Sequence, residues 1–177
     1  MTMPHELADA QEEIGRGPER IDSSRFSPAN RRRLSAPGLR TFLSIADVWR
    51  LTEEQRRLIL GYPSRSTYHN WVKTVREHGD LTLDVDTLTR ISALLGIYQA
   101  MGILFRSESE GLAWLQGPHK ATVFGGQSPL ALIISGTQDA LLTVRRFLDG
   151  ARGGLYMQPN EIDREFRPYT DADVIFS

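Results

Sequence analysis

The sequence predicts an all-α protein with two parts, a helix-turn-helix bundle followed by a small helical domain. Three observations support this fold class. Apolar residues recur at intervals of three and four in several stretches, as they do on one face of an α-helix. Serine, threonine or aspartate precedes these stretches, where helix N-caps are expected, and glycine follows most of them.

Residues 1–40 are polar, with an acidic first half, a basic second half and few large apolar side chains. Burying so little apolar surface cannot offset the entropy lost on ordering, so we expect a mostly disordered leader. A short helix is one option over residues 6–14. Arg31, Arg32 and Arg33 could contact phosphate groups or form a solvated basic arm.

Two helices are expected between Leu43 and Gly61. Ser44 can cap a short helix over residues 45–51. Thr52 then stands three residues before Gln55, which is the spacing of a capping box, in which two side chains satisfy the free amides at a helix start. This spacing predicts a helix over residues 53–60 that ends at Gly61.

Cap residues and apolar stripes predict the next two helices. Ser64 can cap a helix that ends near Gly79, with an apolar stripe formed by Tyr68, Trp71, Val72 and Val75. A long helix is expected over residues 84–105, with Asp84 and Asp86 near the positive end of its dipole. Its apolar face is expected to contain Leu88, Ile91, Leu94, Leu95, Tyr98, Met101 and Leu104.

The helix over residues 53–60, the connection GYPS and the helix over residues 65–77 have the order of a helix-turn-helix motif. Such a motif inserts its second helix into the major groove of DNA. The face opposite the apolar stripe suits a groove, because arginine and asparagine can contact base edges and lysine and serine can contact phosphates. The candidate DNA-binding residues are Arg65, Ser66, Thr67, His69, Asn70 and Lys73. The same face is also typical of a solvated surface on an ordinary bundle helix.

A second, shorter unit begins after Arg106. A helix over residues 108–115 is expected to end at Gly117-Pro118. Ser128 and Pro129 predict another helix start, because serine suits the N-cap and proline the first helical position. That helix is expected to end at Gly136, and a last amphipathic helix over residues 138–148 to be closed by the glycines at 150, 153 and 154.

Residues 155–177 lack a helical period but carry several large apolar and aromatic side chains. Disordered tails usually have few such groups, which commonly anchor a segment on a partner. This tail is therefore expected either to lie on a partner protein or to pack on its own domain or a second copy of the chain.

Composition excludes several classes of function. The formal net charge of −1 gives no global attraction to nucleic acid or membrane, and the absence of cysteine excludes disulfides and a thiol nucleophile. The N-terminus lacks the apolar segment of a secretory signal, and the interrupted apolar stretch over 91–105 predicts a buried helix. The histidines lack metal-ligand spacing, and neither a P-loop nor a nucleophile elbow occurs. We therefore expect no enzyme, no catalytic residue, no metal and no cofactor, in a cytoplasmic protein.

The stretch from residue 114 to residue 136 resembles the C-terminal toxin-binding domain of the MbcA/ParS/Xre antitoxin family. The motif of that domain corresponds in order to Trp114, Leu115, Pro118, His119, Phe124, Gly125, Gly126, Ser128, Pro129, Leu130 and Gly136. Arg145 falls in a segment similar to the closing helix of the family. Residues 64–71 resemble its recognition helix, and the resemblance covers about residues 43–154.

The resemblance implies an Xre-like helix-turn-helix domain (41–105) and a toxin-binding domain (106–154), and it does not cover the leader (1–40) or the tail (155–177). It implies a type II antitoxin that binds a RES-domain or related NAD-using toxin and occludes its NAD pocket. The helix-turn-helix would bind operator DNA and repress its own operon, as a homodimer or a larger hetero-oligomer with the toxin. The alternative is a helix-turn-helix transcription regulator whose C-terminal part only mediates oligomerisation.

Overall fold

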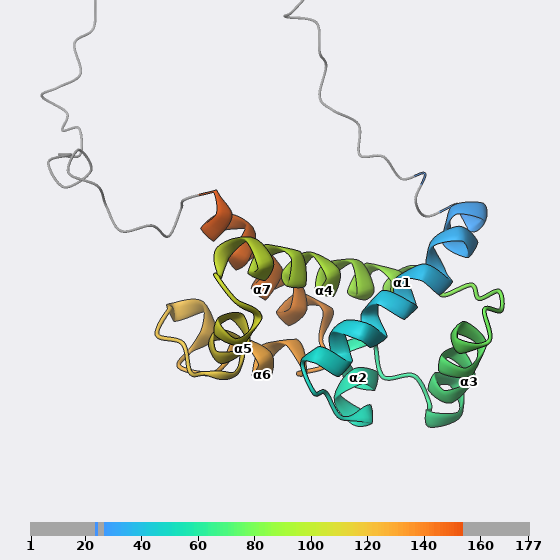
Figure 1. The fold of residues 1–177 in the computed structure, drawn as a ribbon, viewed down its shortest axis with the longest axis horizontal. Helices are drawn as coiled ribbons and strands as arrows, with labels where there is room; N and C mark the ends of the chain where they lie inside the picture. The colour runs from blue at the N-terminus through green and yellow to red at the C-terminus, as the bar shows by residue number, and fades with distance from the viewer. Residues whose placement is uncertain (1–23, 25–26, 154–177) are drawn as a thin grey trace, which may run out of the picture.

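The structure of the protein is a computed structural model that describes residue 24 and residues 27–153. The regular structure of these residues is entirely helical, which confirms the predicted fold class (Figure 1). In chain order the elements are α1 (Pro28–Val48), α2 (Glu53–Ile59), α3 (Arg65–Arg76), α4 (Val85–Leu104), α5 (Glu108–Gln116), the 3-10 turn η5 (Thr122–Phe124), α6 (Pro129–Ile133) and α7 (Gln138–Arg152).

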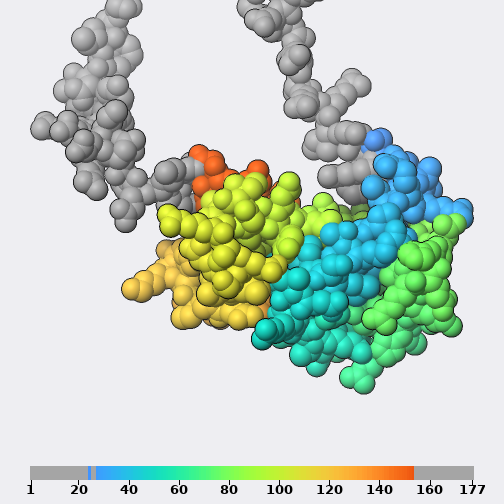
Figure 2. Space-filling model, viewed as in Figure 1, coloured from blue at the N-terminus to red at the C-terminus, as the bar shows by residue number. Residues whose placement is uncertain are grey.

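Helix α4 is the central element of the fold, and α7 and α1 are its main packing partners. Helices α2 and α3 lie toward one end of the molecule and α5 and α6 toward the other (Figure 1). Figure 2 shows the N-terminal half, in blue to green, packed beside the C-terminal half, in yellow to orange. One core joins the halves, since Phe42 of α1, Leu94 and Ile97 of α4 and Val144 of α7 are all fully buried.

By length and composition alone, α4 could cross a membrane. In the fold it is instead the core helix between α1 and α7, in agreement with the expected buried helix. Tyr98 departs from the expected apolar face, because its side chain is 37% exposed. Its hydroxyl donates to Glu108 of α5 (3.3 Å) at the surface of the molecule.

Helix α1 corrects two expectations. Residues 28–40 are not disordered, and no helix begins at Ser44, because residues 28–48 form one continuous helix. Ser27 caps this helix by accepting a hydrogen bond from the amide of Asn30, and Pro28 occupies its first turn. The same Ser-Pro pattern that predicts the start of α6 therefore also operates here.

The interior of α1 explains why this helix is difficult to predict. Pro37 and Gly38 lie inside it, and both residue types disfavour helix interiors. Burial of Leu39, Phe42 and Ile45 in the shared core outweighs that preference. The rest of the leader, including the helix suggested over residues 6–14, lies outside the described residues, as does the tail over 155–177.

Most of the remaining helix boundaries agree with the sequence. Three expected N-cap residues each accept a hydrogen bond from the amide of the third residue that follows, and they are Thr52, Ser64 and Ser128. Asp84, expected in the first turn of α4, is the N-cap of that helix. Helix α6 is shorter than expected and ends at residue 133. Helix α7 does not end at Gly150, because Asp149 pairs with Arg145 (2.8 Å) and Arg152 (3.7 Å) on either side of this glycine and supports the last turn.

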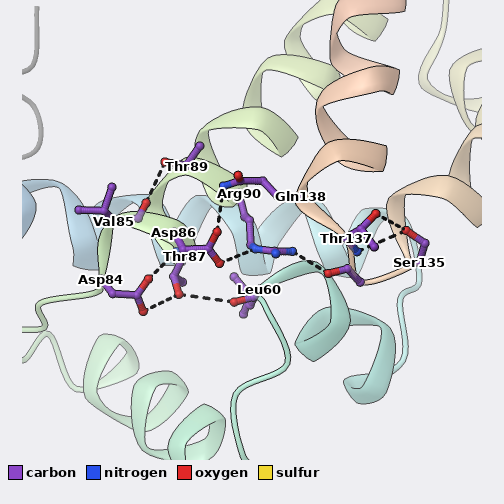
Figure 3. A network of polar contacts seen from close by, with 11 residues as sticks. Leu60, Asp84, Val85, Asp86, Thr87, Thr89, Arg90, Ser135, Thr137 and Gln138 are labelled. Atoms are coloured by element: carbon purple, nitrogen blue, oxygen red, sulfur yellow. Dashed lines mark hydrogen bonds and ion pairs between the residues drawn. The ribbon is translucent and has the colours of Figure 1, made fainter.

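A polar network at the start of α4 joins the two halves (Figure 3). Arg90, which is only 9% exposed, donates from Nε to Asp86 (2.7 Å) and from Nη1 to the carbonyl of Gly136 between α6 and α7 (2.9 Å). Gln138 of α7 donates to the second Asp86 oxygen (2.9 Å). The hydroxyl of Thr87 donates to the carbonyl of the residue that caps the end of α2 (3.5 Å). The end of α2 and the start of α7 are thus attached to the same turn of α4.

Candidate functional site

The turn between α2 and α3 is held by Arg57, a side chain of α2 that is 8% exposed. Its Nε donates to the carbonyl of Pro63 (2.8 Å), and its guanidinium lies 4.5 Å from the centroid of the Tyr62 ring. Gly61 and Tyr62 both have positive φ angles, which glycine adopts readily and tyrosine rarely. The cation–π contact with Arg57 stabilises Tyr62 in this conformation, so the two helices have a defined relative orientation.

Helix α3 has one face in the core and one in solvent. Tyr68 and Val75 are buried, while Trp71 and Val72 are half-buried, so the predicted apolar stripe is confirmed. On the opposite side, five of the candidate DNA-binding residues are exposed together: Arg65, Ser66, His69, Asn70 and Lys73. This arrangement has the side-chain chemistry and the exposure that a helix needs to enter a groove.

Thr67, the sixth candidate, takes part in the start of the helix. It is half-buried, its Oγ1 lies 2.8 Å from Ser64 Oγ, and its amide donates to the same oxygen (3.1 Å). Ser66 Oγ also lies 3.0 Å from Ser64 Oγ. These hydroxyl groups complete the N-cap of α3 and fix the helix end from which Arg65 projects.

Glu53 belongs to this surface although the sequence suggests only a role in the first turn of α2. Its Oε2 lies 2.9 Å from His69 Nε2, and its Oε1 lies 3.6 Å from Arg65 Nε. The hydrogen bond with His69 lowers the pKa of Glu53 below its ordinary value, so the carboxylate is ionised at neutral pH. The sequence places Glu53 in the first turn of the first helix of the predicted helix-turn-helix, but only the fold brings its side chain to α3.

A shallow groove of about 520 Å³ runs along this surface, between α2 and α3. It carries charges of both signs and a few apolar atoms, and its lining residues are Leu51, Glu53, Arg56, Tyr68, His69, Val72, Lys73, Arg76 and Glu77. The mixture of signs means that attraction to phosphate is local to the basic side chains rather than spread over the face.

The second unit is organised around an aromatic cluster. The Trp114 ring of α5 stacks on the Phe147 ring of α7, with centroids 6.2 Å apart. Phe124 of η5 meets Phe147 edge to face at 4.8 Å, and His119 lies 4.8 Å from Phe124 and 5.5 Å from Phe147. Aromatic pairs at these separations stabilise each other beyond simple burial. Residues that are far apart in the motif therefore form one packed group.

The loop within this unit is closed by local hydrogen bonds. The His119 amide donates to the Gln127 carbonyl (3.1 Å), and His119 Nδ1 accepts from the Ala121 amide (3.1 Å). Gly125 and Gly126 have φ angles of 56° and 81°, which explains the glycine pair, because other residues adopt such angles only at a cost. His119 therefore has an architectural role in the loop.

The other motif positions are packing positions. Leu115 and Pro129 are buried, Leu130 is half-buried, and Pro118 is exposed at the end of α5. Gly136 has a φ of +86°, and a Cβ at this position would lie 3.2 Å from Leu58 of α2. Glycine at this position therefore allows the α6–α7 turn to approach the helix-turn-helix.

Arg145 also acts within the fold. Its guanidinium lies directly over Gly96 of α4, where a Cβ would overlap it, and its Nε donates to Asp149 (2.8 Å). The side chain is 30% exposed. The absence of a side chain at residue 96 thus lets α7 pack closely on α4 through Arg145.

The outer surface of the second unit is accessible to a partner. Val123 of η5 is 42% exposed, and it lies beside the buried Phe124. A separate hollow of about 260 Å³ is lined by residues from the end of α1, the end of α4 and the start of α5, and it includes Trp49, Tyr98 and Phe105. The motif did not suggest Val123, because its exposure depends on how η5 folds.

Comparison with known proteins agrees with this geometry. Residues 28–96 match the family model of the antitoxin Xre-like helix-turn-helix domain, and residues 102–154 match that of the antitoxin Xre/MbcA/ParS C-terminal toxin-binding domain. The uncharacterized protein y4oB of Sinorhizobium fredii (strain NBRC 101917 / NGR234) is 37% identical over 116 residues, which are 66% of this chain and 84% of y4oB. The first match begins at the start of α1, so that helix is part of the helix-turn-helix domain. The chain belongs to the Xre/MbcA/ParS antitoxin family, with an Xre-like helix-turn-helix domain followed by a toxin-binding domain.

Proposed function

We propose that the chain neutralises the toxin of a type II toxin–antitoxin pair and represses the operon that encodes both proteins. The proposed toxin is a RES-domain enzyme that degrades NAD, or a related NAD-using enzyme. The chain would act in the cytoplasm by covering the NAD pocket, and none of its residues would take part in chemistry. The observation that carries the proposal is the presence of both family domains, joined through α4, in one chain.

The toxin-binding part of the proposal is supported by the construction of the second unit. Its aromatic cluster and loop hydrogen bonds give the unit a fixed shape, and a preorganised surface loses little entropy when it binds. Val123 offers an exposed apolar contact on that surface.

The DNA-binding part is supported by the exposed face of α3. Five candidate residues share that face, and Arg57 and the Ser64 cap fix its orientation relative to α2. Symmetric operators are usually bound by dimers, so we propose that a homodimer or a larger assembly with the toxin binds the operator.

Co-expression with the neighbouring gene tests the proposal. If the neighbour encodes the toxin, its expression alone should arrest growth, and co-expression with this chain should restore growth and allow the two proteins to be purified together. A transcription regulator whose C-terminal part only mediates oligomerisation would neither restore growth nor be purified with the neighbouring gene product, and that result would contradict the proposal.

A pair of matched variants tests the surface of the second unit. Val123→Asp should weaken toxin binding by at least tenfold, because it puts a charge at an apolar contact (about 1.4 kcal/mol or more). Val85→Asp makes the same change at a valine that is 40% exposed at the start of α4, and it should leave toxin binding unchanged. Equal effects of the two variants in a binding titration would exclude η5 as the contact.

A further inference from the structure

We propose that Glu53 is a positioning residue for DNA recognition. It orients Arg65 and His69 toward bases and so raises sequence discrimination, and its negative charge lowers the affinity for DNA of any sequence. This inference rests on the proposed DNA-binding function of α3. It adds a residue on α2 that the recognition helix does not contain and that no sequence motif identifies.

The geometry gives Glu53 two partners on the neighbouring helix. Glu53 is the first residue of α2, and its two carboxylate oxygens are divided between His69 (2.9 Å) and Arg65 (3.6 Å). The side chains of Arg65 and His69 are 75% and 60% exposed, and within residues 27–153 no other hydrogen bond or ion pair holds either of them. Without Glu53, a long side chain such as Arg65 would sample many rotamers.

The contacts with Glu53 leave other nitrogen atoms of Arg65 and His69 accessible for contact with bases. Glu53 faces Arg65 through Nε, so both terminal nitrogens of the guanidinium stay available. Those nitrogens form the pair of parallel hydrogen bonds by which arginine reads guanine O6 and N7 in the major groove. On His69 the contact occupies Nε2 and leaves Nδ1. A guanidinium that this ion pair biases toward one orientation loses less entropy on pairing with a base, and it pairs less well with incorrect bases.

The same carboxylate weakens general attraction to DNA. Glu53 and Glu54 place two negative charges in the first turn of α2, and Glu53 lies beside the exposed face of α3. Binding that depends only on phosphate contacts gains affinity when such a charge is removed. Within the described residues Glu54 has no hydrogen bond or ion pair, so it supplies the same charge without orienting a partner.

This difference between neighbouring glutamates provides the test. The full chain and its Glu53→Gln and Glu54→Gln variants are titrated with two duplexes of equal length, one from the region upstream of its own gene and one with the same bases shuffled. Thermal melting of each variant checks that the fold is retained.

Both variants should bind the shuffled duplex about two to five times more tightly, because each loses one negative charge near the phosphates. Glu53→Gln should also lower the ratio of affinities for the upstream and shuffled duplexes by about tenfold, which corresponds to one weakened base contact. Glu54→Gln should leave that ratio unchanged.

Two results would overturn the inference. If the ratio is the same in Glu53→Gln as in the unmodified chain, or falls equally in both variants, Glu53 contributes charge alone. If the unmodified chain binds the two duplexes equally, the DNA-binding part of the proposed function is wrong, and the inference is wrong with it.

Discussion

Arg90 illustrates how one side chain can couple two family domains. It lies in the first half of α4, within the match to the helix-turn-helix domain, and it donates to the carbonyl of Gly136 in the toxin-binding domain. Its ion pair with Asp86 (2.7 Å) neutralises a guanidinium that would be costly to bury alone. The same aspartate accepts from Gln138 (2.9 Å), so one carboxylate connects α4 to α7 while it pairs with Arg90.

Replacement of Arg90 by alanine should lower the free energy of unfolding by about 2 kcal/mol, because the Gly136 carbonyl loses its buried donor and the packing of the long side chain is lost. Arg33→Ala, at an exposed position of α1, should change the free energy of unfolding by less than about 0.5 kcal/mol. Urea denaturation of both variants measures the difference, and equal midpoints would show that the network does not stabilise the fold.

At the scale of elements, α1 is a core helix rather than part of a leader. Its buried residues Leu39, Phe42 and Ile45 lie in the same core as those of α4. Ser35, which is fully buried, accepts a hydrogen bond from the Leu83 amide before α4 (2.9 Å), so the helix is also attached by a buried polar contact. Truncation before α1 and truncation within α1 should therefore have very different effects on the stability of the fold.

A chain that begins at residue 24 keeps α1, its cap and the Ser24 carbonyl that accepts from Asn30 (2.9 Å), and it should unfold cooperatively. A chain that begins at residue 41 loses the first turns of α1 together with Leu39, which is fully buried, and should lose cooperative unfolding. Circular dichroism during heating distinguishes the two. Cooperative unfolding of the shorter chain at an unchanged temperature would contradict the core role of α1.

Helix α3 provides the second prediction at this scale. Arg65→Ala and Lys73→Ala should each weaken binding to upstream DNA. Lys73→Ala should lower the slope of log affinity against log salt by about one for its lost phosphate contact, and Arg65→Ala should lower it by less, because Arg65 is proposed to contact a base. Arg106→Ala removes the same charge at an exposed position between α4 and α5 and should leave the slope unchanged. Titrations at several salt concentrations measure this slope, and unchanged slopes for both α3 variants would remove α3 from the interface.

At the scale of the whole molecule, the two halves share α4. Leu141, Val144 and Leu148 of α7 are buried, and α7 packs more extensively on α4 than on any other element of the described structure. The toxin-binding half thus uses a helix of the other half as one wall of its core. A separate second half would expose this apolar surface.

A fragment that begins at residue 106 should therefore show no cooperative unfolding, since it lacks α4 and is near the size below which a single core is marginal, about 70 residues. A fragment that begins at residue 84 restores the whole of α4 and should unfold cooperatively. Calorimetry of both fragments tests this prediction. A cooperative transition in the shorter fragment would show that the second unit is independent of α4.

Local rules determined much of the fold. The capping box at Thr52, the Ser64 cap and the Ser128-Pro129 start all depend on contacts within a few residues, so sequence spacing was sufficient to predict them. The apolar stripe of α3 and its exposed polar face were predictable for the same reason, because helical periodicity fixes which side chains share a face. The family motif, which depends on ordered spacing, likewise identified the second domain.

Only the tertiary structure decided the contacts between distant segments. The sequence does not indicate that Glu53 reaches Arg65 and His69, that Arg90 reaches Gly136, or that Arg145 needs the space above Gly96. The sequence also predicted a disordered leader over residues 28–40, because this stretch is polar and has few large apolar side chains. Packing against α4 stabilises these residues as part of helix α1. The free energy gained by burying the apolar face of α1 exceeds the cost of one proline and one glycine in a helix, but only when α4 is in place to cover that face.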